Sequence, residues 1–430
     1  MSFLLSTFVR TRPSPNKPTH ELVSQILVDS HNVRVVGGQE DAADATSSAS
    51  SSSGRPGASE AAASYGPFSG VLGPGTSQDA AYDALTSELV RGFLQSRTNC
   101  TIFAYGQTGS GKTYTLFGPP GCFGAESSSG APSSSSVGDQ SFGLCPRAIL
   151  AIKRAVQNSR GGSSGGGATT TLFVSAVEIY LEECYDLLNN KVKVPIAGFA
   201  TVAKKVGGSF NNQQLGGAAR TADGKWVPPV VNGKRNPALN QIEVRGCKEV
   251  DILGGRNCGA GEDDGERQLL HVMRVIEATR SGRSHALNER SSRSHCIVTL
   301  TMTRVAEARQ TKTQFLFVDL AGSERIKKTD VLGAGAQEAR SINLSLSSLG
   351  RCVSALQQGG AAGSAFVPWR DSALTMLMKQ SLSGGPCRTA LCVCIAEDGT
   401  WASETVSSLR FGVTCGRLRG AGAGGGRGSR

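Results

Sequence analysis

The sequence predicts an α/β fold in three layers, with a central, mixed and mostly parallel β-sheet flanked by helices on both faces. Two observations lead to this prediction. Short apolar runs typical of buried strands are interspersed along the chain with segments of helical periodicity, a mixture that favours layered α/β domains. One apolar run also ends in a glycine-rich turn that leads into a helix, which is the local order of a phosphate-binding loop.

The predicted strands are short apolar runs. The first covers residues 1–9, which lack the basic region of a signal peptide and which we interpret as a core strand. Residues 99–105 are followed directly by a glycine, residues 296–302 alternate at period two, and residues 313–318 lead directly to Asp319. The other predicted strands are 171–180 and 388–395.

Helical periodicity predicts helices at 78–96, 146–158, 266–281, 337–358 and 402–413. No internal repeat and no sustained heptad is present, so we expect no coiled-coil stalk in this chain. No apolar run approaches the roughly 20 residues that cross a bilayer, so we expect a soluble protein without a membrane partner.

Low-complexity segments interrupt these elements. Glycine contributes 55 of the 430 residues, well above its usual share of about 7%. We expect one domain over 1–415, with disordered insertions near 43–64, 121–139, 160–168, 196–241 and 254–265, because structured segments resume after each of them. Residues 416–430 are predicted to be a flexible tail rich in glycine and arginine.

Charge and cysteine content limit the classes of partner. A net charge of +11 and a pI of about 9.2 favour a polyanionic partner, which leaves nucleic acid, an anionic membrane and an acidic filament open. The 12 cysteines include no C-x-x-C pair, and Cys392 and Cys394 fall on alternate positions of one predicted strand. We therefore expect reduced structural cysteines rather than zinc ligands or disulfides.

Residues 106–113 fit the phosphate-binding pattern G-x-x-x-x-G-K-[ST] completely. Glycines let successive backbone N–H groups point at phosphate oxygens, and the helix dipole behind them adds positive potential. Lys112 supplies a charge for the β- and γ-phosphates, and Thr113 supplies a hydroxyl for Mg²⁺. The predicted nucleotide ligands in this loop are Gly106, Gln107, Thr108, Gly109, Ser110, Gly111, Lys112 and Thr113. The sequence thus predicts a P-loop NTPase fold that binds a nucleotide.

Two polar segments further along the chain have the composition of phosphate sensors. Residues 288–295 concentrate three serines, an asparagine and two arginines, groups that can bind a metal's water shell and orient an attacking water. Residues 319–324 follow an apolar strand, which places Asp319 to hold Mg²⁺ through water and Gly322 to present its N–H to the γ-phosphate.

The P-loop, the S-S-R-S-H run at 291–295 and the D-L-A-G-S-E run at 319–324 together resemble the kinesin motor domain. The R-T-R-P run at 10–13, the E-I-Y and Y-D-L-L runs at 178–180 and 185–188, and segments 341–350, 369–372 and 404–412 agree with it. The resemblance covers roughly 8–413. The early segment and residues 407–411 further suggest the kinesin-9 group of flagellar kinesins.

The resemblance implies an enzyme, a microtubule-dependent ATP hydrolase with Mg²⁺ as cofactor. Adenine would be flanked by Arg10, Arg12, Pro13 and Tyr114. The metal would be held by Thr113, by Ser291 and, through water, by Asp319. The catalytic groups would be Ser292, Arg293, Gly322 and Glu324, with Arg293 paired to Glu324. The resemblance also implies a cytoplasmic protein on the microtubule cytoskeleton, with the cilium or flagellum as a narrower site, and no nucleic acid partner.

The filament-facing side departs from the family. The predicted microtubule-binding residues are Arg325, Lys327, Lys328, Arg340, Arg370 and Lys379. The family's Lys-Leu-Thr-Arg is Ala-Leu-Thr-Met at 373–376, and Leu344 replaces a lysine, so we expect exposed cations to be lost from this side. A glycine-rich tail also stands where processive members have a neck linker and coiled coil. Three functions remain open: an active motor, a nucleotide-gated microtubule-binding scaffold with weak or no motility, and a P-loop NTPase acting on nucleic acid.

Overall fold

The computed structural model describes residues 4–13, 25–36, 63–124, 141–160, 169–196, 219–220, 226–227, 247–253, 264–281, 292–306, 309–324, 334–358, 366–383, 387–397 and 401–418. Most of the predicted insertions and the tail from residue 419 lie outside these ranges. None of the helices in the described part combines the length and apolar character needed to cross a lipid bilayer.

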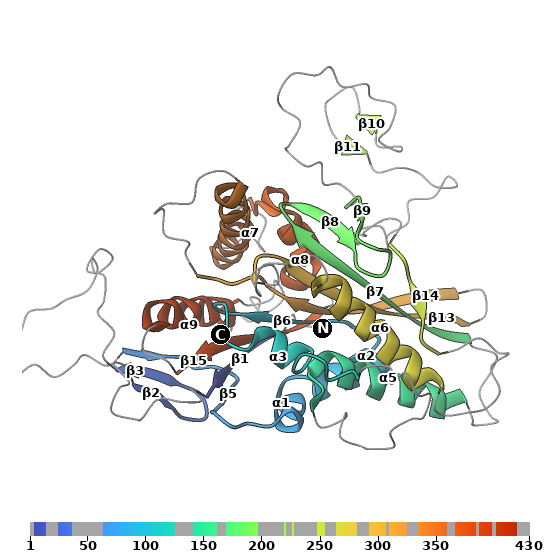
Figure 1. The fold of residues 1–430 in the computed structure, drawn as a ribbon, viewed down its shortest axis with the longest axis horizontal. Coiled ribbons are helices and arrows are strands. Elements are labelled where there is room, and N and C mark those ends of the chain that lie inside the picture. The colour runs from blue at the N-terminus through green and yellow to red at the C-terminus, as the bar shows by residue number, and fades with distance from the viewer. Residues whose placement is uncertain are drawn as a thin grey trace, which may run out of the picture.

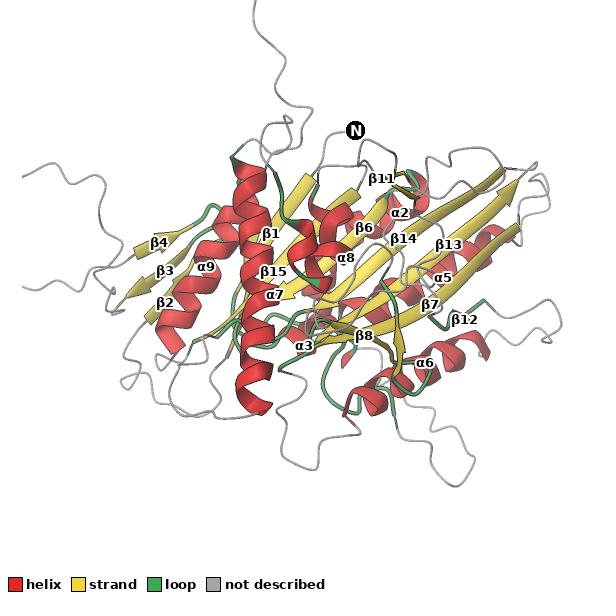
Figure 2. Cartoon of the chain, turned by 90° about the horizontal axis from the view of Figure 1, so that it is seen from above, coloured by secondary structure: helices red, strands yellow, loops and turns green. Residues whose placement is uncertain are grey.

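A ten-stranded sheet forms the centre of the protein (Figure 2), and its strands follow the order β5-β1-β15-β6-β14-β13-β7-β8-β9, with β12 paired to β7. The strands are β1 (Leu4–Arg12), β5 (Gly70–Leu72), β6 (Asn99–Tyr105), β7 (Thr169–Tyr180), β8 (Glu183–Asp186), β9 (Val192–Val194), β12 (Val250–Asp251), β13 (His295–Ala306), β14 (Arg309–Asp319) and β15 (Cys387–Ala396). Neighbours from β5 to β14 are parallel, and the pairs from β14 to β9 and to β12 are antiparallel.

Helices cover both faces of this sheet, and Figure 1 shows α7 and α8 above it and α1 and α5 below it. One face carries α1 (Gln78–Leu85), α2 (Ser87–Gln95), α3 (Lys112–Leu116), α5 (Leu144–Arg160) and α6 (Asp264–Ser281). The other face carries α7 (Ala334–Gln357), α8 (Ala373–Leu382) and α9 (Ala402–Gly416). Side chains alternate between the two cores along β6, where buried Ile102 packs with the first set and buried Phe103 with the second. The predicted three-layer fold is confirmed.

The long predicted elements are present, and several short ones were not predicted. The segment 78–96 divides at Thr86 into α1 and α2. Helix α8 was not predicted; its first turn is capped by Ser372, whose hydroxyl accepts the N–H of Leu374 at 3.0 Å. A 3-10 helix, η5 (Trp369–Asp371), precedes it. Two small sheets were not predicted either. One consists of β2 (Gln25–Val28), β3 (Val33–Val36) and β4 (Ala63–Tyr65), and the other of β10 (Ala219–Arg220) and β11 (Trp226–Val227).

The register of the central strands brings the three polar motifs to one edge of the sheet. β14 lies parallel to β6 with Asp319 beside Ala104, so Asp319 and the P-loop that follows β6 emerge together. β13 is antiparallel to β14 and pairs Cys296 with Asp319, so β13 begins at the same edge where β14 ends. The carboxyl ends of parallel strands are the usual place for ligand sites in open α/β sheets.

Candidate nucleotide site

The P-loop closes around the amino group of Lys112. Gly106 has φ +148°, and a Cβ at this position would overlap the carbonyl oxygen of Cys394, so only glycine allows the turn to pass so close to β15. Nζ of Lys112 donates to the carbonyl oxygens of Gly106 and Gln107, each at 2.8 Å. Burial lowers the pKa of Lys112, while the nearby Asp319 raises it. The loop therefore holds a buried amino group whose hydrogen-bond partners are backbone carbonyl oxygens, which phosphate oxygens could replace.

Two predicted metal ligands meet beside this loop. The Thr113 hydroxyl donates to Oδ2 of Asp319 at 2.7 Å, and a guanidinium nitrogen of Arg280 lies 2.6 Å from the same oxygen. Asp319 is fully buried, and its Oδ1 is without a hydrogen-bond partner in the described part of the chain. A hydroxyl beside a buried carboxylate oxygen with free acceptor capacity fits Mg²⁺, which takes few protein ligands and keeps waters and substrate phosphates. The third predicted ligand, Ser291, lies outside the described residues.

The loop after β14 is bound to both of its neighbours at this edge. The N–H of Gly322 donates to the carbonyl oxygen of Ser292 at 2.8 Å, which links the loop to the segment that precedes β13. The N–H of Ser323 donates to the carbonyl oxygen of Gly106 at 3.1 Å, which links it to the P-loop. A Cβ on Gly322 would overlap the Glu324 carboxylate and the Thr108 hydroxyl, so a larger residue would separate these contacts.

Glu324 is held by the P-loop residue Thr108. Its Oε2 accepts the N–H of Thr108 at 2.8 Å, and its Oε1 accepts the Thr108 hydroxyl. Arg293, the predicted partner of Glu324, is half-buried at the neighbouring loop. The Arg293–Glu324 pair stays a prediction, whereas the Thr108–Glu324 contact was not predicted because nothing in the sequence relates these distant positions.

Of the residues predicted to flank adenine, three are exposed and one is buried. Arg12, Pro13 and Tyr114 are exposed around the P-loop, and a guanidinium nitrogen of Arg12 donates to the carbonyl oxygen of Gly109. Arg10 is only 7% exposed and donates to Gln78 Oε1 at 2.9 Å. Its guanidinium carbon lies 5.4 Å from the centre of the Tyr114 ring. Arg10 therefore supports Tyr114 from beneath by a cation–π contact.

A buried charge pair, not predicted, supports the segment before β13. Oε1 of Glu178 accepts the Ser294 hydroxyl at 2.8 Å, and Oε2 lies 2.9 Å from Nζ of Lys191. The side chains of Glu178 and Lys191 are 0% and 5% exposed. Lys191 and Asn190 have φ values of 57° and 49°, the left-handed region that side-chain-bearing residues rarely adopt. No sequence signal identified Lys191, because its burial depends on how β8 and β9 fold over β7.

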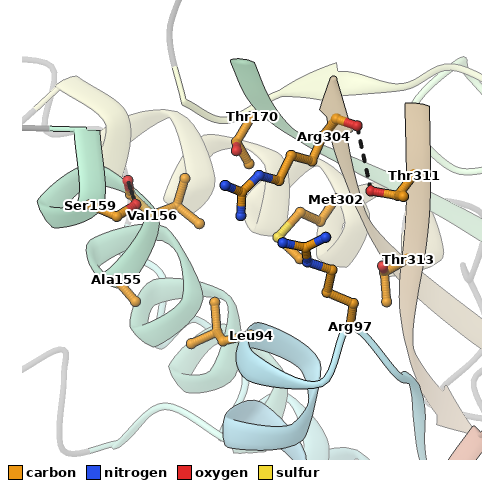
Figure 3. A pocket seen from close by; sticks show the side chains of 10 residues that line it. All are labelled: Leu94, Arg97, Ala155, Val156, Ser159, Thr170, Met302, Arg304, Thr311 and Thr313. Carbon is orange, nitrogen blue, oxygen red and sulfur yellow. Dashed lines mark hydrogen bonds between the residues drawn. The ribbon is translucent and has the colours of Figure 1, made fainter. Parts of the chain in front are cut away.

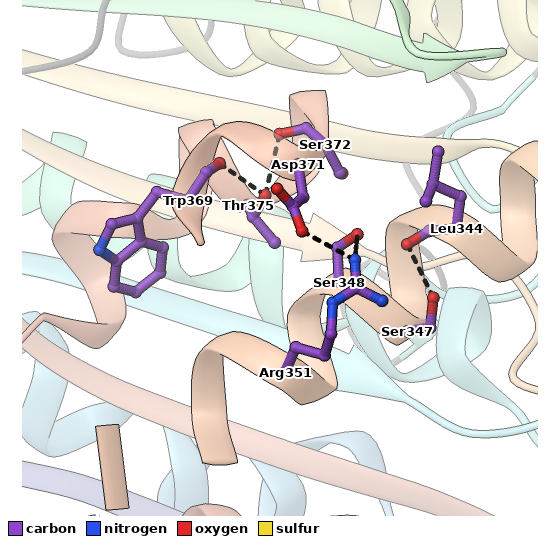
Figure 4. Close-up of polar contacts among 8 residues, drawn as sticks. All are labelled: Leu344, Ser347, Ser348, Arg351, Trp369, Asp371, Ser372 and Thr375. Carbon is purple, nitrogen blue, oxygen red and sulfur yellow. Dashed lines mark hydrogen bonds and ion pairs between the residues drawn. The ribbon is translucent and has the colours of Figure 1, made fainter. Parts of the chain in front are cut away.

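The predicted filament side surrounds α7, η5 and α8. Figure 4 shows Arg351 of α7 bonded to Asp371 of η5 at 2.9 Å, and Thr375 of α8 bonded to the carbonyl oxygen of Trp369 at 2.7 Å. These bonds hold the three elements together. Arg370 and Lys379 are exposed. The predicted residues Arg325, Lys327 and Lys328 lie outside the described residues, as does the side chain of Arg340.

The three positions where the family has cations and this chain does not differ in exposure. Ala373 and Met376, which stand where the family has cations, are 0% and 5% exposed and belong to the core between α8 and the sheet. Leu344, in contrast, is 41% exposed on α7. The expected loss of exposed cations at the three positions stays a prediction.

The fold and the edge site define a nucleotide-binding protein of the P-loop class. The kinesin motor domain family model matches residues 10–215 and 240–417, and the chain belongs to this family. It is 30% identical over 362 residues to mouse kinesin-like protein KIF7, and the aligned region covers 82% of this chain and 22% of KIF7. It is 32% identical over 347 residues to rice kinesin-like protein KIN-14K, covering 80% of this chain and 27% of that protein.

A solved structure described as a fast kinesin superimposes with a TM-score of 0.66 and 26% identity, covering 97% of this chain and 92% of that chain. The chain spans about a quarter of the length of these two curated relatives. The kinesin-9 assignment stays a prediction.

Proposed function

We propose that this chain is a microtubule-stimulated ATPase motor domain that couples ATP hydrolysis to microtubule binding and force generation. The observation that carries the proposal is the joining of three loops at one sheet edge. The P-loop meets the loop after β14 through Thr108 and Glu324, and that loop meets the segment before β13 through Gly322 and Ser292. A group that binds the P-loop can therefore move both other loops.

The site residues divide the work of phosphoryl transfer. Lys112 and the P-loop N–H groups bind the phosphates, and Arg12 and Tyr114 border the base. Thr113 and Asp319 would hold Mg²⁺, which neutralises developing charge on the phosphates when bound. When the loops close, Glu324 would change its partner from Thr108 to Arg293. The Arg293–Glu324 pair would then position the attacking water, and the Glu324 carboxylate would accept its proton.

The link to the filament runs through α7. His295, next to Ser294 at the nucleotide edge, hydrogen-bonds Ser345 of α7, and α7 is bonded in turn to η5. A displacement of the edge loops would therefore be transmitted to the elements that carry Arg370 and Lys379. We place the protein on cytoplasmic microtubules, with residues 1–415 as the motor unit and the cilium or flagellum as a narrower site.

A nucleotide-gated microtubule-binding scaffold is the alternative. The observation that favours it is the exposed Leu344 on α7, where the family has a lysine. An apolar side chain contributes no attraction to an acidic filament, whereas each surface cation contributes up to about 1 kcal/mol at low salt.

Steady-state ATPase measured with and without polymerised tubulin separates these functions, with co-sedimentation as the parallel readout. A motor shows strong stimulation by microtubules. Co-sedimentation without stimulation supports the scaffold and contradicts the motor. Stimulation by RNA or DNA instead would contradict both. Lys112→Ala serves as the control that reports contaminating ATPase.

A further inference from the structure

A pocket of about 230 Å³ lies on the helix face of the sheet that carries α2 and α5. It is enclosed by the end of α2, the last turns of α5 and the ends of β7, β13 and β14 (Figure 3). We infer that this pocket binds a small molecule with an apolar body and a single carboxylate. The proposal does not rest on nucleotide binding or on motor activity.

The pocket is remote from the nucleotide site. β13 begins at His295 beside the P-loop edge, and Arg304, which lines the pocket, lies near the other end of the same strand. At about 3.3 Å per strand residue, the two ends are separated by roughly 30 Å. The pocket ligand is therefore distinct from the nucleotide.

Two guanidinium groups enter the pocket from different elements. Figure 3 shows the side chains of Arg97, from the turn after α2, and Arg304, from β13, both reaching into the space between α5 and the strands. Among the residues that the structure describes, no carboxylate lines the pocket and neither guanidinium has an ion-pair partner. Both arginines are exposed, so solvent screens the repulsion between them, and an anion that contacts both guanidinium groups is attracted by each.

The backbone at Arg97 adds a second indication. Arg97 follows the C-cap Ser96 of α2 and has φ +50°, the left-handed conformation that glycine usually supplies at this position of a helix end. An arginine is strained there relative to glycine, and its side chain is directed into the pocket.

The other lining residues indicate which chemical groups of the ligand would lie beside its carboxylate. Leu94, Val156 and Met302 provide an apolar floor, and Val156 and Met302 are 5% and 7% exposed. Ser159, Thr170, Thr311 and Thr313 add hydroxyls to the lining. A planar carboxylate can accept two parallel hydrogen bonds from a guanidinium group, and an apolar body can pack on Leu94, Val156 and Met302. A ligand with both parts therefore matches the charged and the apolar residues of the lining.

The test measures binding of 3-phenylpropionate to the full chain by ligand-observed NMR, against the neutral 3-phenylpropionamide. We expect the acid to bind at least tenfold more tightly than the amide. We expect Arg97→Gln and Arg304→Gln each to weaken the acid at least threefold, and the double variant to abolish the preference for the acid.

Arg91→Gln is the matched control, because Arg91 lies on the same helix α2 but pairs with Glu88 at 2.7 Å outside the pocket. It should leave the affinity for the acid unchanged. Equal affinity for acid and amide, or a retained preference in the double variant, would overturn the proposal. An effect of Arg91→Gln as large as that of Arg97→Gln would also overturn it, because general surface charge would then explain the binding.

Discussion

The imidazole Nε2 of His295 and the hydroxyl oxygen of Ser345 lie 2.8 Å apart, which ties the start of β13 to the middle of α7. Nδ1 of the same ring accepts the N–H of Ala321 at 3.0 Å, so the ring is neutral and its proton is on Nε2. Ser345 passes the hydrogen bond on to the carbonyl oxygen of Ile342 at 2.9 Å. One histidine thus connects both nucleotide-edge loops with the helix on the predicted filament side.

This neutral histidine predicts a pH dependence of stability. Burial lowers the pKa of His295 from 6.5 to about 3. The unfolded chain therefore takes up the proton first, and the stabilisation is complete above about pH 6.5 and lost progressively toward pH 3, at about 1.4 kcal/mol per pH unit.

Between about pH 7 and pH 5, the parent protein should lose about 2 kcal/mol more unfolding free energy than His295→Gln. Urea unfolding of both proteins at the two pH values measures the difference. Parallel losses in the two proteins would show that the buried imidazole does not govern the response.

Removing the P-loop cation should abolish nucleotide binding. Lys112→Ala deletes the ammonium group that bonds Gly106 and Gln107. Hydrogen bonds to charged groups contribute about 1.5–3 kcal/mol each, so affinity for ATP should fall at least about 100-fold. Titration with a fluorescent ATP analogue and Mg²⁺ checks this. Lys193→Ala, at an exposed lysine of β9, is the control and should bind as the parent does.

Glu324→Ala should separate binding from turnover. The substitution removes the carboxylate that Thr108 holds while leaving Lys112, Thr113 and Asp319 in place. ATP affinity should stay within about threefold of the parent, whereas turnover should fall at least about 100-fold if this carboxylate assists proton transfer. Single-turnover hydrolysis is the measurement, and Glu183→Ala, at a carboxylate of β8, is the control. Normal turnover in Glu324→Ala would contradict the role given to this residue.

Breaking the Glu178–Lys191 pair from one side should be costly. Lys191→Met leaves a fully buried carboxylate without its cation and should lower the unfolding free energy by about 3 kcal/mol. The double variant Lys191→Met, Glu178→Gln should recover most of that loss, because no uncompensated charge remains. Denaturant unfolding of the four proteins in this cycle gives the coupling energy. Additive effects would show that the two side chains do not interact.

The exposed leucine on α7 predicts a gain of filament affinity. Leu344→Lys places a cation on a surface where the family carries one and should tighten microtubule binding up to about fivefold at low salt. The gain should fade as ionic strength rises, because the charges are exposed. Co-sedimentation across a salt series measures it. The control is Val305→Lys, at an exposed position near the end of β13 that is far from α7 in sequence. Equal gains in both variants would mean that total charge, not the α7 surface, determines affinity.

Much of the site could be predicted because its signals are local. The P-loop spacing, the position of Asp319 after an apolar strand and the polar run at 291–295 can each be recognised within a few residues. Backbone curvature, phosphate contact and strand ends depend on neighbouring positions, so the three-layer fold and the three loops followed from these patterns.

What the tertiary structure alone decided concerns residues that are distant in sequence. Pairing of Cys296 with Asp319 and of Asp319 with Ala104 places the loops at one edge, and it brings Thr108 to Glu324. Burial of Lys191 and of Met376 likewise depends on which strand or helix covers them. The sequence around a basic or apolar residue does not show which distant residues will pack against it. The sequence by itself determined which groups can bind phosphate and metal; the packing of the sheet and helices decided which distant side chains hold those groups, since contact energies arise only after the chain has folded.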